Sequence, residues 1–171
     1  MKGSMPMDRS KSNASSESSQ AKKAFSAALR VLSRRDRSET ELRQKLEQFG
    51  FSDSVIETAV EKCREYNYLN DNRYATERAR ALMRSGRGVG RKIKLDLQRR
   101  GIDEPTVEQA LETAEAEFPT DQLLRDQLLR RFPNFNYLTA DSREKRRVIG
   151  FFQRRGFPLG QIFTILKEEP K

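Results

Sequence analysis

The stretch LRQKLEQFGFSDSVIETAV (Leu42–Val60) decides the fold, because it recurs twice more along the chain. The later copies are IKLDLQRRGIDEPTVEQAL (Ile93–Leu111) and VIGFFQRRGFPLGQIFTIL (Val148–Leu166). The three segments align without gaps at offsets of 51 and 55 residues, and at least six columns hold only apolar residues or only glycine. A repeat with this period is typical of a tandem array of small helical units.

The columns of the repeat predict two helices with a glycine between them. In the first copy Leu42, Leu46 and Phe49 are spaced i, i+4 and i+7, which places them on one face of a helix. A glycine then ends this helix, because the left-handed conformation that follows a last turn strains other residues. This glycine recurs in all three copies, as Gly50, Gly101 and Gly156. Helix starts are marked by a capping box at Ser38–Glu41 and by a variant of it at Asp141–Glu144.

A further helix is predicted before each pair, over roughly 21–34, 71–85 and 120–132. At an offset of 50 residues, apolar residues of the first two of these helices coincide, as in Phe25 with Ala75 and Leu29 with Ala79. A three-helix unit of this size cannot bury a sufficient core alone, so neighbouring repeats must stack. The predicted fold class is all-α, an elongated tandem array of three three-helix, helix-turn-helix-like repeats. The expected boundaries are 1–20 for a disordered serine-rich tail and 21–69, 70–118 and 119–171 for the repeats.

Composition narrows the classes of function. The 171 residues include 34 Lys+Arg and 25 Asp+Glu, which gives a net charge of +9. The absence of histidine removes the commonest general acid and base and the histidine-containing zinc sites. A single cysteine excludes an internal disulfide framework and fits a reducing cytoplasm, and no apolar run is long enough to predict a transmembrane helix. We therefore expect a basic cytoplasmic binding protein, without a cofactor, that recognises nucleic acid or a nucleoprotein.

Three features that resemble catalytic or nucleotide sites are better explained otherwise. The glycines of Gly86–Lys92 are misplaced for a dinucleotide or phosphate-binding motif and follow a helix, not a strand. Two interpretations of this loop remain: a flexible connection, or a loop whose N–H groups and Arg87 face an anionic partner. Cys63 lies on the apolar stripe of its helix and is predicted to be a buried core residue. No pair of carboxylates is suited to hydrolysis, so we predict no enzyme activity and neither catalytic nor metal-binding residues.

Basic residues are concentrated in two blocks that occupy similar places in successive repeats. Residues 73–100 contain ten Lys or Arg and two acids, and residues 143–155 contain six and one. In a stacked array the two blocks can form one basic track that binds an anionic partner. The predicted track consists of Arg73, Arg80, Arg84, Arg87, Arg91, Lys92, Lys94, Arg99, Arg100, Arg143, Lys145, Arg146, Arg147, Arg154 and Arg155.

Several short motifs together point to one protein family. They are Tyr68-Leu69-Asn70-Asp71-Asn72-Arg73-Tyr74-Ala75, then Gly86-Arg87-Gly88, and later Arg154-Arg155-Gly156-Phe157. With the repeat itself, these residues resemble the RecX family, the bacterial regulators of the RecA recombinase. The resemblance covers roughly residues 21–168, and Val89 departs from it where an aromatic-Gly-Pro type of loop is common.

The resemblance implies a function without catalysis. Members of the family bind the RecA–DNA filament and inhibit RecA ATPase, strand exchange and coprotease activity, which places them in homologous recombination, DNA repair and the SOS response. The partners implied are the RecA filament and single- or double-stranded DNA, and we expect a monomer that does not bind membranes. The main alternative is a direct DNA-binding module, since a helix pair such as 38–49 and 53–66 resembles a helix-turn-helix unit. A third interpretation is a structural adaptor that binds another helical protein through its exposed faces.

Overall fold

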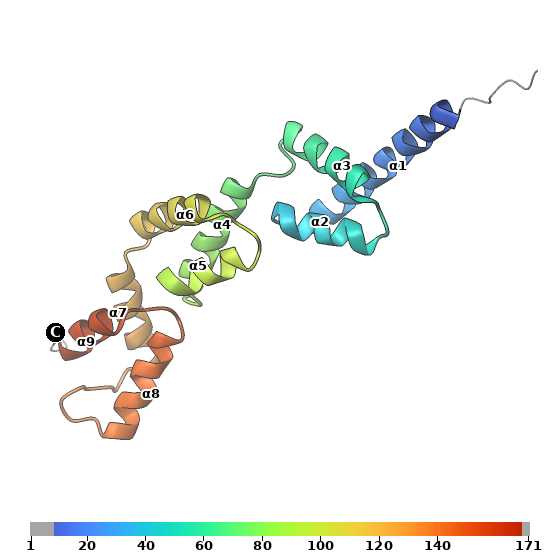
Figure 1. Cartoon of the computed structure of the whole chain (residues 1–171). Coiled ribbons are helices and arrows are strands. Elements are labelled where there is room, and N and C mark those ends of the chain that lie inside the picture. The colour runs from blue at the N-terminus through green and yellow to red at the C-terminus, as the bar shows by residue number, and fades with distance from the viewer. Residues whose placement is uncertain (1–8, 169–171) are drawn as a thin grey trace, which may run out of the picture. The chain divides into compact units, whose positions relative to one another are not determined.

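The chain consists of helices throughout the part that the structure describes. The computed structural model describes residues 9–168, with the backbone alone for residues 9–16. The helices are α1 (Arg9–Leu32), α2 (Glu39–Gln48), α3 (Asp53–Glu65), α4 (Asp71–Arg84), α5 (Gly90–Gln98), α6 (Glu104–Glu117), α7 (Thr120–Arg131), α8 (Ser142–Gln153) and α9 (Leu159–Lys167) (Figure 1). Residues 9–168 contain no strand, and the predicted all-α series of three three-helix repeats is confirmed.

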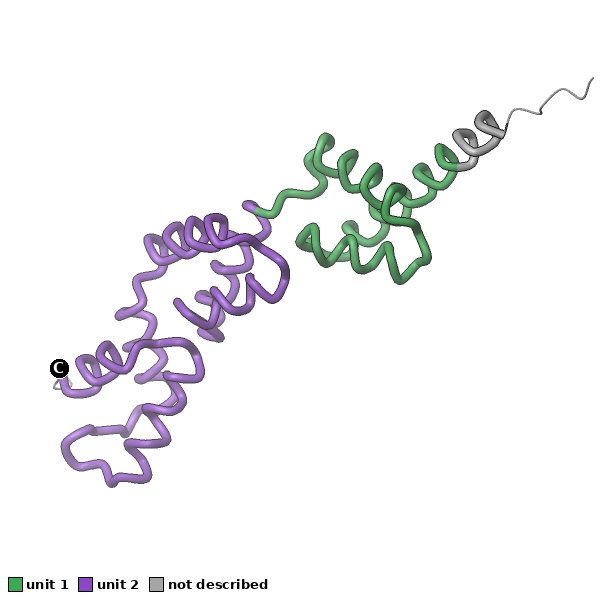
Figure 2. The backbone as a smooth tube through the Cα atoms, viewed as in Figure 1, with its two compact units in different colours: residues 1–71 green, residues 72–171 purple. Residues whose placement is uncertain are grey.

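The repeats are distributed over two compact units, residues 1–71 and 72–171 (Figure 2). The first unit has a core of its own, in which Ala24 and Ala28 of α1 face Leu42, Leu46 and other apolar residues of α2 and α3. Cys63 belongs to this core and is fully buried, as predicted.

The second and third repeats share one continuous core within the second unit. Ile93 and Leu97 of α5 belong to the same apolar cluster as Val148 and Phe152 of α8. The expectation that neighbouring repeats stack is confirmed for these two, because burial of their apolar faces requires both.

The repeat glycines end their helices in the way the sequence predicts. Gly50, Gly101 and Gly156 have positive φ angles of 85°, 78° and 96°. After α2, the N–H of Gly50 donates to Glu47 O at 2.8 Å and that of Phe51 to Leu46 O at 3.3 Å. The same two hydrogen bonds follow α5 and α8, so all three helices end in a Schellman motif.

Side-chain caps begin several of the helices. Ser38 Oγ accepts from the N–H of Glu41 at 3.2 Å, and the Glu41 carboxylate accepts from the N–H of Ser38 at 3.2 Å, which completes the predicted capping box. At α8 the Asp141 carboxylate accepts from the N–H of Glu144 at 2.7 Å. These bonds satisfy backbone donors that a first helical turn otherwise leaves without partners.

The N-terminal helix is longer than the sequence predicts. Helix α1 begins at Arg9, so the expected disordered tail is wrong for residues 9–20, while residues 1–8 lie outside the described part of the chain. Neither glycine nor proline occurs between residues 9 and 32, so nothing in the backbone stops the helix that the core-facing residues establish.

Candidate nucleic-acid interface

The glycine-rich loop between α4 and α5 packs against the third repeat. Gly86 ends α4 with φ 64°, and a Cβ atom there would come within 2.8 Å of the buried Gln127 side chain of α7. The N–H of Val89 donates to Arg155 O at 2.8 Å. The interpretation as a flexible connection is therefore incorrect, since the loop backbone is hydrogen-bonded to the third repeat, and the positive φ of Gly86 favours glycine.

A second close approach joins the start of α5 to the end of α8. A Cβ atom on Gly156 would lie 2.3 Å from Val89 O and 3.0 Å from Lys92 N. The first turn of α5 and the last turn of α8 thus meet backbone to backbone. Because α5 starts within the first basic block and α8 ends within the second, this contact brings the two blocks together.

Six cations gather around this contact, and we call them the junction cluster. They are Arg87, Arg91 and Lys92 of the second repeat and Arg131, Arg154 and Arg155 of the third. Arg155 is the half-buried member: its Nε donates to Gly86 O at 3.0 Å, and its guanidinium lies 3.5 Å from the centroid of the Phe151 ring. Burial, together with the positive charges of Arg131 and Arg154, lowers the pKa of Arg155. Arg131 and Arg154 are therefore close enough to Arg155 to repel its positive charge.

The junction cluster carries a positive charge that the described residues do not neutralise. Its other five cations, namely Arg87, Arg91, Lys92, Arg131 and Arg154, are exposed, and none of them forms an ion pair with another side chain between residues 17 and 168. A concentration of exposed like charges produces a local potential that attracts anions such as phosphate groups.

Several residues of the predicted track instead hold the second repeat together. Arg80 pairs with Glu117 of α6, with Nε–Oε2 at 2.9 Å, and with Glu77 at 2.6 Å. Lys94 pairs with Glu104. The pairs with Glu117 and Glu104 join the basic half of the repeat to its acidic helix, so the sequence overstates the positive charge available to a partner.

Two further arginines of the track are engaged within the same repeat. Arg100 donates to Asp96 at 3.0 Å and to the Tyr74 hydroxyl at 3.2 Å. Arg84 lies with its guanidinium 5.8 Å from the Phe118 ring centroid. Both side chains therefore have an internal partner that a ligand would have to compete with.

The remaining track residues lie around the third repeat or away from the junction. Lys145 and Arg147 of α8 lie over the rings of Tyr137 and Phe132, at 4.8 and 5.5 Å from the ring centroids. Exposed positions outside the junction cluster are Arg143 and Arg146 on α8, Arg99 after α5 and Arg73 in the first turn of α4. Helix α4 separates Arg73 from the junction by about 20 Å, given the rise of a helix of this length.

Arg131 is the member of the junction cluster that the sequence does not reveal. It ends α7, outside both basic blocks, and it lies near Arg155, where the adjacent Phe132 ring contacts Phe151 and Phe152 of α8. The pair Arg130-Arg131 before Phe132-Pro133 is the available signal, but basic residues at a helix end are ordinary because they interact favourably with the helix dipole.

The described residues contain neither a membrane-spanning helix nor a cluster of metal ligands. Between residues 9 and 168 the helices are too short or too polar for any of them to cross a bilayer. Among the described side chains, no group of three or more Cys, Asp or Glu residues is placed to hold a metal ion.

Comparison with known proteins gives the same family for every part of the fold. Models of the first, second and third three-helix domains of RecX match residues 24–63, 70–111 and 120–166. The regulatory protein RecX of Syntrophotalea carbinolica is 45% identical over 146 residues, which is 85% of this chain and 95% of that protein. That of Trichlorobacter lovleyi is 36% identical over 140 residues, covering 82% and 91%.

Solved structures agree with these sequence matches. A crystal structure of RecX from Lactobacillus salivarius has a TM-score of 0.69 at 25% identity and covers 88% of this chain and 97% of that one. Another crystal structure of a regulatory protein RecX has a TM-score of 0.76 at 24% identity, covers 99% and 82% of the two chains and shows the same fold. With three matching domain models and close relatives over nearly its whole repeat region, this chain belongs to the RecX family of regulatory proteins.

Proposed function

We propose that this protein inhibits the RecA recombinase by binding the RecA–DNA filament through the junction cluster. The observation that carries the proposal is the backbone contact between the start of α5 and the end of α8, because it brings together basic segments of two repeats whose exposed cations form no ion pair among residues 17–168. Family membership supports a regulatory role that depends on binding. The expected consequences are lower ATPase, strand-exchange and coprotease activities of RecA.

The physical basis of the proposal is the fixed spacing of the cluster. Backbone contacts at Val89 and Gly156 hold its two halves together, so little conformational entropy is lost when the cations meet an anionic surface. Each phosphate that the cations neutralise releases condensed counterions, which makes binding to a nucleoprotein favourable at low salt and weaker as salt rises.

The test is a titration of RecA ATPase on single-stranded DNA with wild type and with the triple variant R87E/R91E/R154E. All three side chains are exposed and form no ion pair with side chains of residues 17–168, so the variant should fold. The matched control is K22E/K23E/K62E, which makes the same change in charge at exposed positions of the first unit. We expect the junction variant to require at least about tenfold more protein for half-inhibition and the control less than about twofold more.

The outcomes separate the proposal from direct DNA binding. If the junction variant inhibits RecA as well as wild type does, the cluster is not the binding surface. If wild type has no effect on RecA but binds naked DNA tightly with a steep salt dependence, the alternative of a DNA-binding module replaces the proposal.

A further inference from the structure

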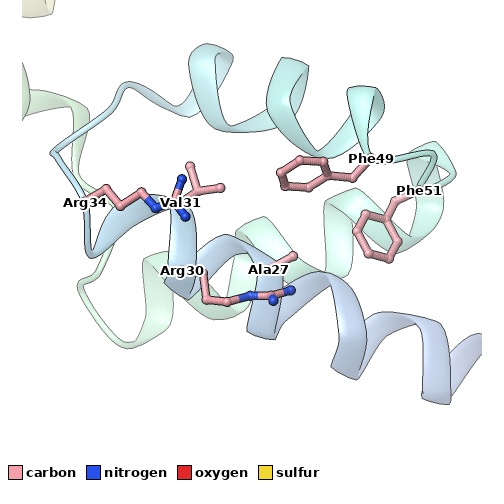
Figure 3. Close-up of a pocket in the computed structure, with 6 residues that line it drawn as sticks. All are labelled: Ala27, Arg30, Val31, Arg34, Phe49 and Phe51. Atoms are coloured by element: carbon pink, nitrogen blue, oxygen red, sulfur yellow. The ribbon is translucent and has the colours of Figure 1, made fainter.

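The first unit carries an apolar groove that the proposed function does not use. It has a volume of about 320 Å³ and lies between α1 and the turn that joins α2 to α3 (Figure 3). Helix α1 contributes Ala27, Arg30 and Val31, the turn after α1 contributes Arg34, and the turn between α2 and α3 contributes the rings of Phe49 and Phe51. Phe49 is 50% exposed, which is a large apolar area to leave in water.

The second repeat shows why this groove is open. Buried Ala24 and Ala28 match buried Ala75 and Ala79, so the first helices align at an offset of 51 residues rather than the predicted 50. At this offset the positions Ala27, Lys45 and Phe49 correspond to Arg78, Asp96 and Arg100. In the second repeat these three side chains form an ion-pair network. Oδ2 of Asp96 lies 2.9 Å from Nε of Arg78 and 3.0 Å from Nε of Arg100.

In the first repeat the residues at the same three positions cannot form such a network. Ala27 is too short to reach across, and Lys45 lies over the Phe49 ring, 5.2 Å from its centroid. The ion-pair network of the second repeat is thus replaced by an apolar wall with a cation at its edge. The second repeat fills this space with its own side chains, whereas the first repeat leaves it open to another molecule.

The two arginines that line the groove determine which kind of molecule can bind there. Arg30 in the last turn of α1 and Arg34 just after the helix are exposed, and neither forms an ion pair with any side chain that the structure describes. They favour carboxylates and oppose a basic partner. The groove walls between them are hydrocarbon and aromatic, so they favour an apolar side chain.

The lining favours a peptide over a nucleic acid. Its side chains are alanine, valine, phenylalanine and arginine, and none of them offers a hydrogen-bond acceptor to the edge of a base. An apolar side chain requires none. A flexible acidic segment can place a phenylalanine or leucine in the groove while its neighbouring carboxylates meet the arginines.

We propose that this groove binds an acidic peptide segment of a partner protein. One apolar side chain of the segment packs against Ala27, Val31 and Phe49, and flanking carboxylates pair with Arg30 and Arg34. The site uses residues of the first unit only, so its failure or success is independent of the junction cluster in the second unit.

The experiment uses the full-length protein and the fluorescein-labelled peptide DDELFDED, followed by fluorescence anisotropy. We expect saturable binding that weakens by at least about tenfold when the central LF of the peptide is replaced by AA. The variant R30E/R34E should weaken binding by a similar factor. The matched control K22E/K62E has the same change in charge within the same unit and should weaken it by less than about twofold, because screening limits attraction beyond about 8 Å.

Three results would overturn the site. One is an absence of saturable binding up to about 1 mM peptide, which is weaker than a specific peptide site needs. Another is an equal loss in R30E/R34E and K22E/K62E, because attraction would then depend on net charge alone. The third is tighter binding of labelled octathymidylate than of the peptide, lost in R30E/R34E, which would make the groove a nucleic-acid site. Urea denaturation of each variant checks that it is folded.

Discussion

Gly156 and Gly50 occupy the same column of the repeat, but their surroundings differ. Both have a positive φ, which strains any residue with a Cβ atom by about 1 kcal/mol. A Cβ on Gly156 would also lie 2.3 Å from Val89 O, whereas a Cβ on Gly50 meets no atom within 4 Å. We predict that Gly50→Ala lowers the free energy of unfolding by about 1 kcal/mol and that Gly156→Ala lowers it by about 3 kcal/mol or more. Urea denaturation measures both, and equal losses would show that the α5–α8 contact is not as close as described.

Arg154 and Arg155 are neighbours in the sequence, but their roles differ. Arg155 donates a hydrogen bond to Gly86 O and lies over the Phe151 ring, whereas Arg154 is exposed. We predict that Arg155→Ala lowers the free energy of unfolding by about 2 kcal/mol, the usual contribution of a charge-assisted hydrogen bond, and that Arg154→Ala leaves it nearly unchanged. Filament binding should weaken in Arg154→Ala without any loss of stability. A stable Arg155→Ala would contradict the structural role of this side chain.

At the scale of elements, one carboxylate joins α4 to α5. Burial alone would raise the pKa of Asp96, but hydrogen bonds and charges from Arg78 and Arg100 outweigh it, and the pKa lies below its ordinary value of 3.8. A carboxylate with a lowered pKa stabilises the fold above the pKa of the unfolded chain, and this contribution is lost as pH falls through the lower pKa of the folded state.

The prediction for this network concerns acid unfolding. Asp96→Asn should be less stable than wild type at neutral pH, and the difference should shrink as pH falls below 3.8, because wild type loses the ionised carboxylate there. Urea denaturation at a series of pH values measures the difference directly. A difference that is constant between neutral pH and the acid range would show that the ionised Asp96 is not what joins the two helices.

Elements that depend on local chemistry were predictable from the sequence. The glycines that end α2, α5 and α8 and the capping box at Ser38 follow from backbone conformation and neighbouring side chains. The alignment of the first helices was displaced by one residue, because buried Ala24 and Ala28 match Ala75 and Ala79 at an offset of 51 rather than 50. Alanines alternate with other apolar residues there, so two registers fit the pattern almost equally well.

The candidate site was only partly predictable. Composition identifies the basic blocks, but the partner of a charged side chain often lies far away in the sequence. Glu117 pairs with Arg80 across 37 positions, and Gly86 accepts from Arg155 across 69. Arg131 joins the cluster through helix packing alone. Charge counting therefore locates the region, whereas the fold decides which cations remain available.

At the scale of the whole molecule, the shared core of the second and third repeats makes them a folding unit. Repeat three alone would expose Val148 and Phe152, which pack in one cluster with Ile93 and Leu97. We predict that a fragment of residues 70–171 is helical and unfolds cooperatively, and that residues 119–171 alone are largely unfolded. Far-UV circular dichroism with urea denaturation compares them. A cooperatively folded 119–171 fragment would contradict the dependence on stacking.

The central claim is that the junction cluster binds the RecA filament, and filament binding itself tests it most directly. RecA is assembled on biotinylated single-stranded DNA, and binding of wild type and of R87E/R91E/R154E is followed by interferometry at increasing salt, with the same DNA without RecA as the reference. We predict that wild type binds the filament more tightly than the bare DNA. The variant should bind the filament at least about tenfold more weakly, with a shallower salt dependence. Equal affinity of the two proteins for the filament, or wild-type binding to bare DNA alone, would contradict the claim.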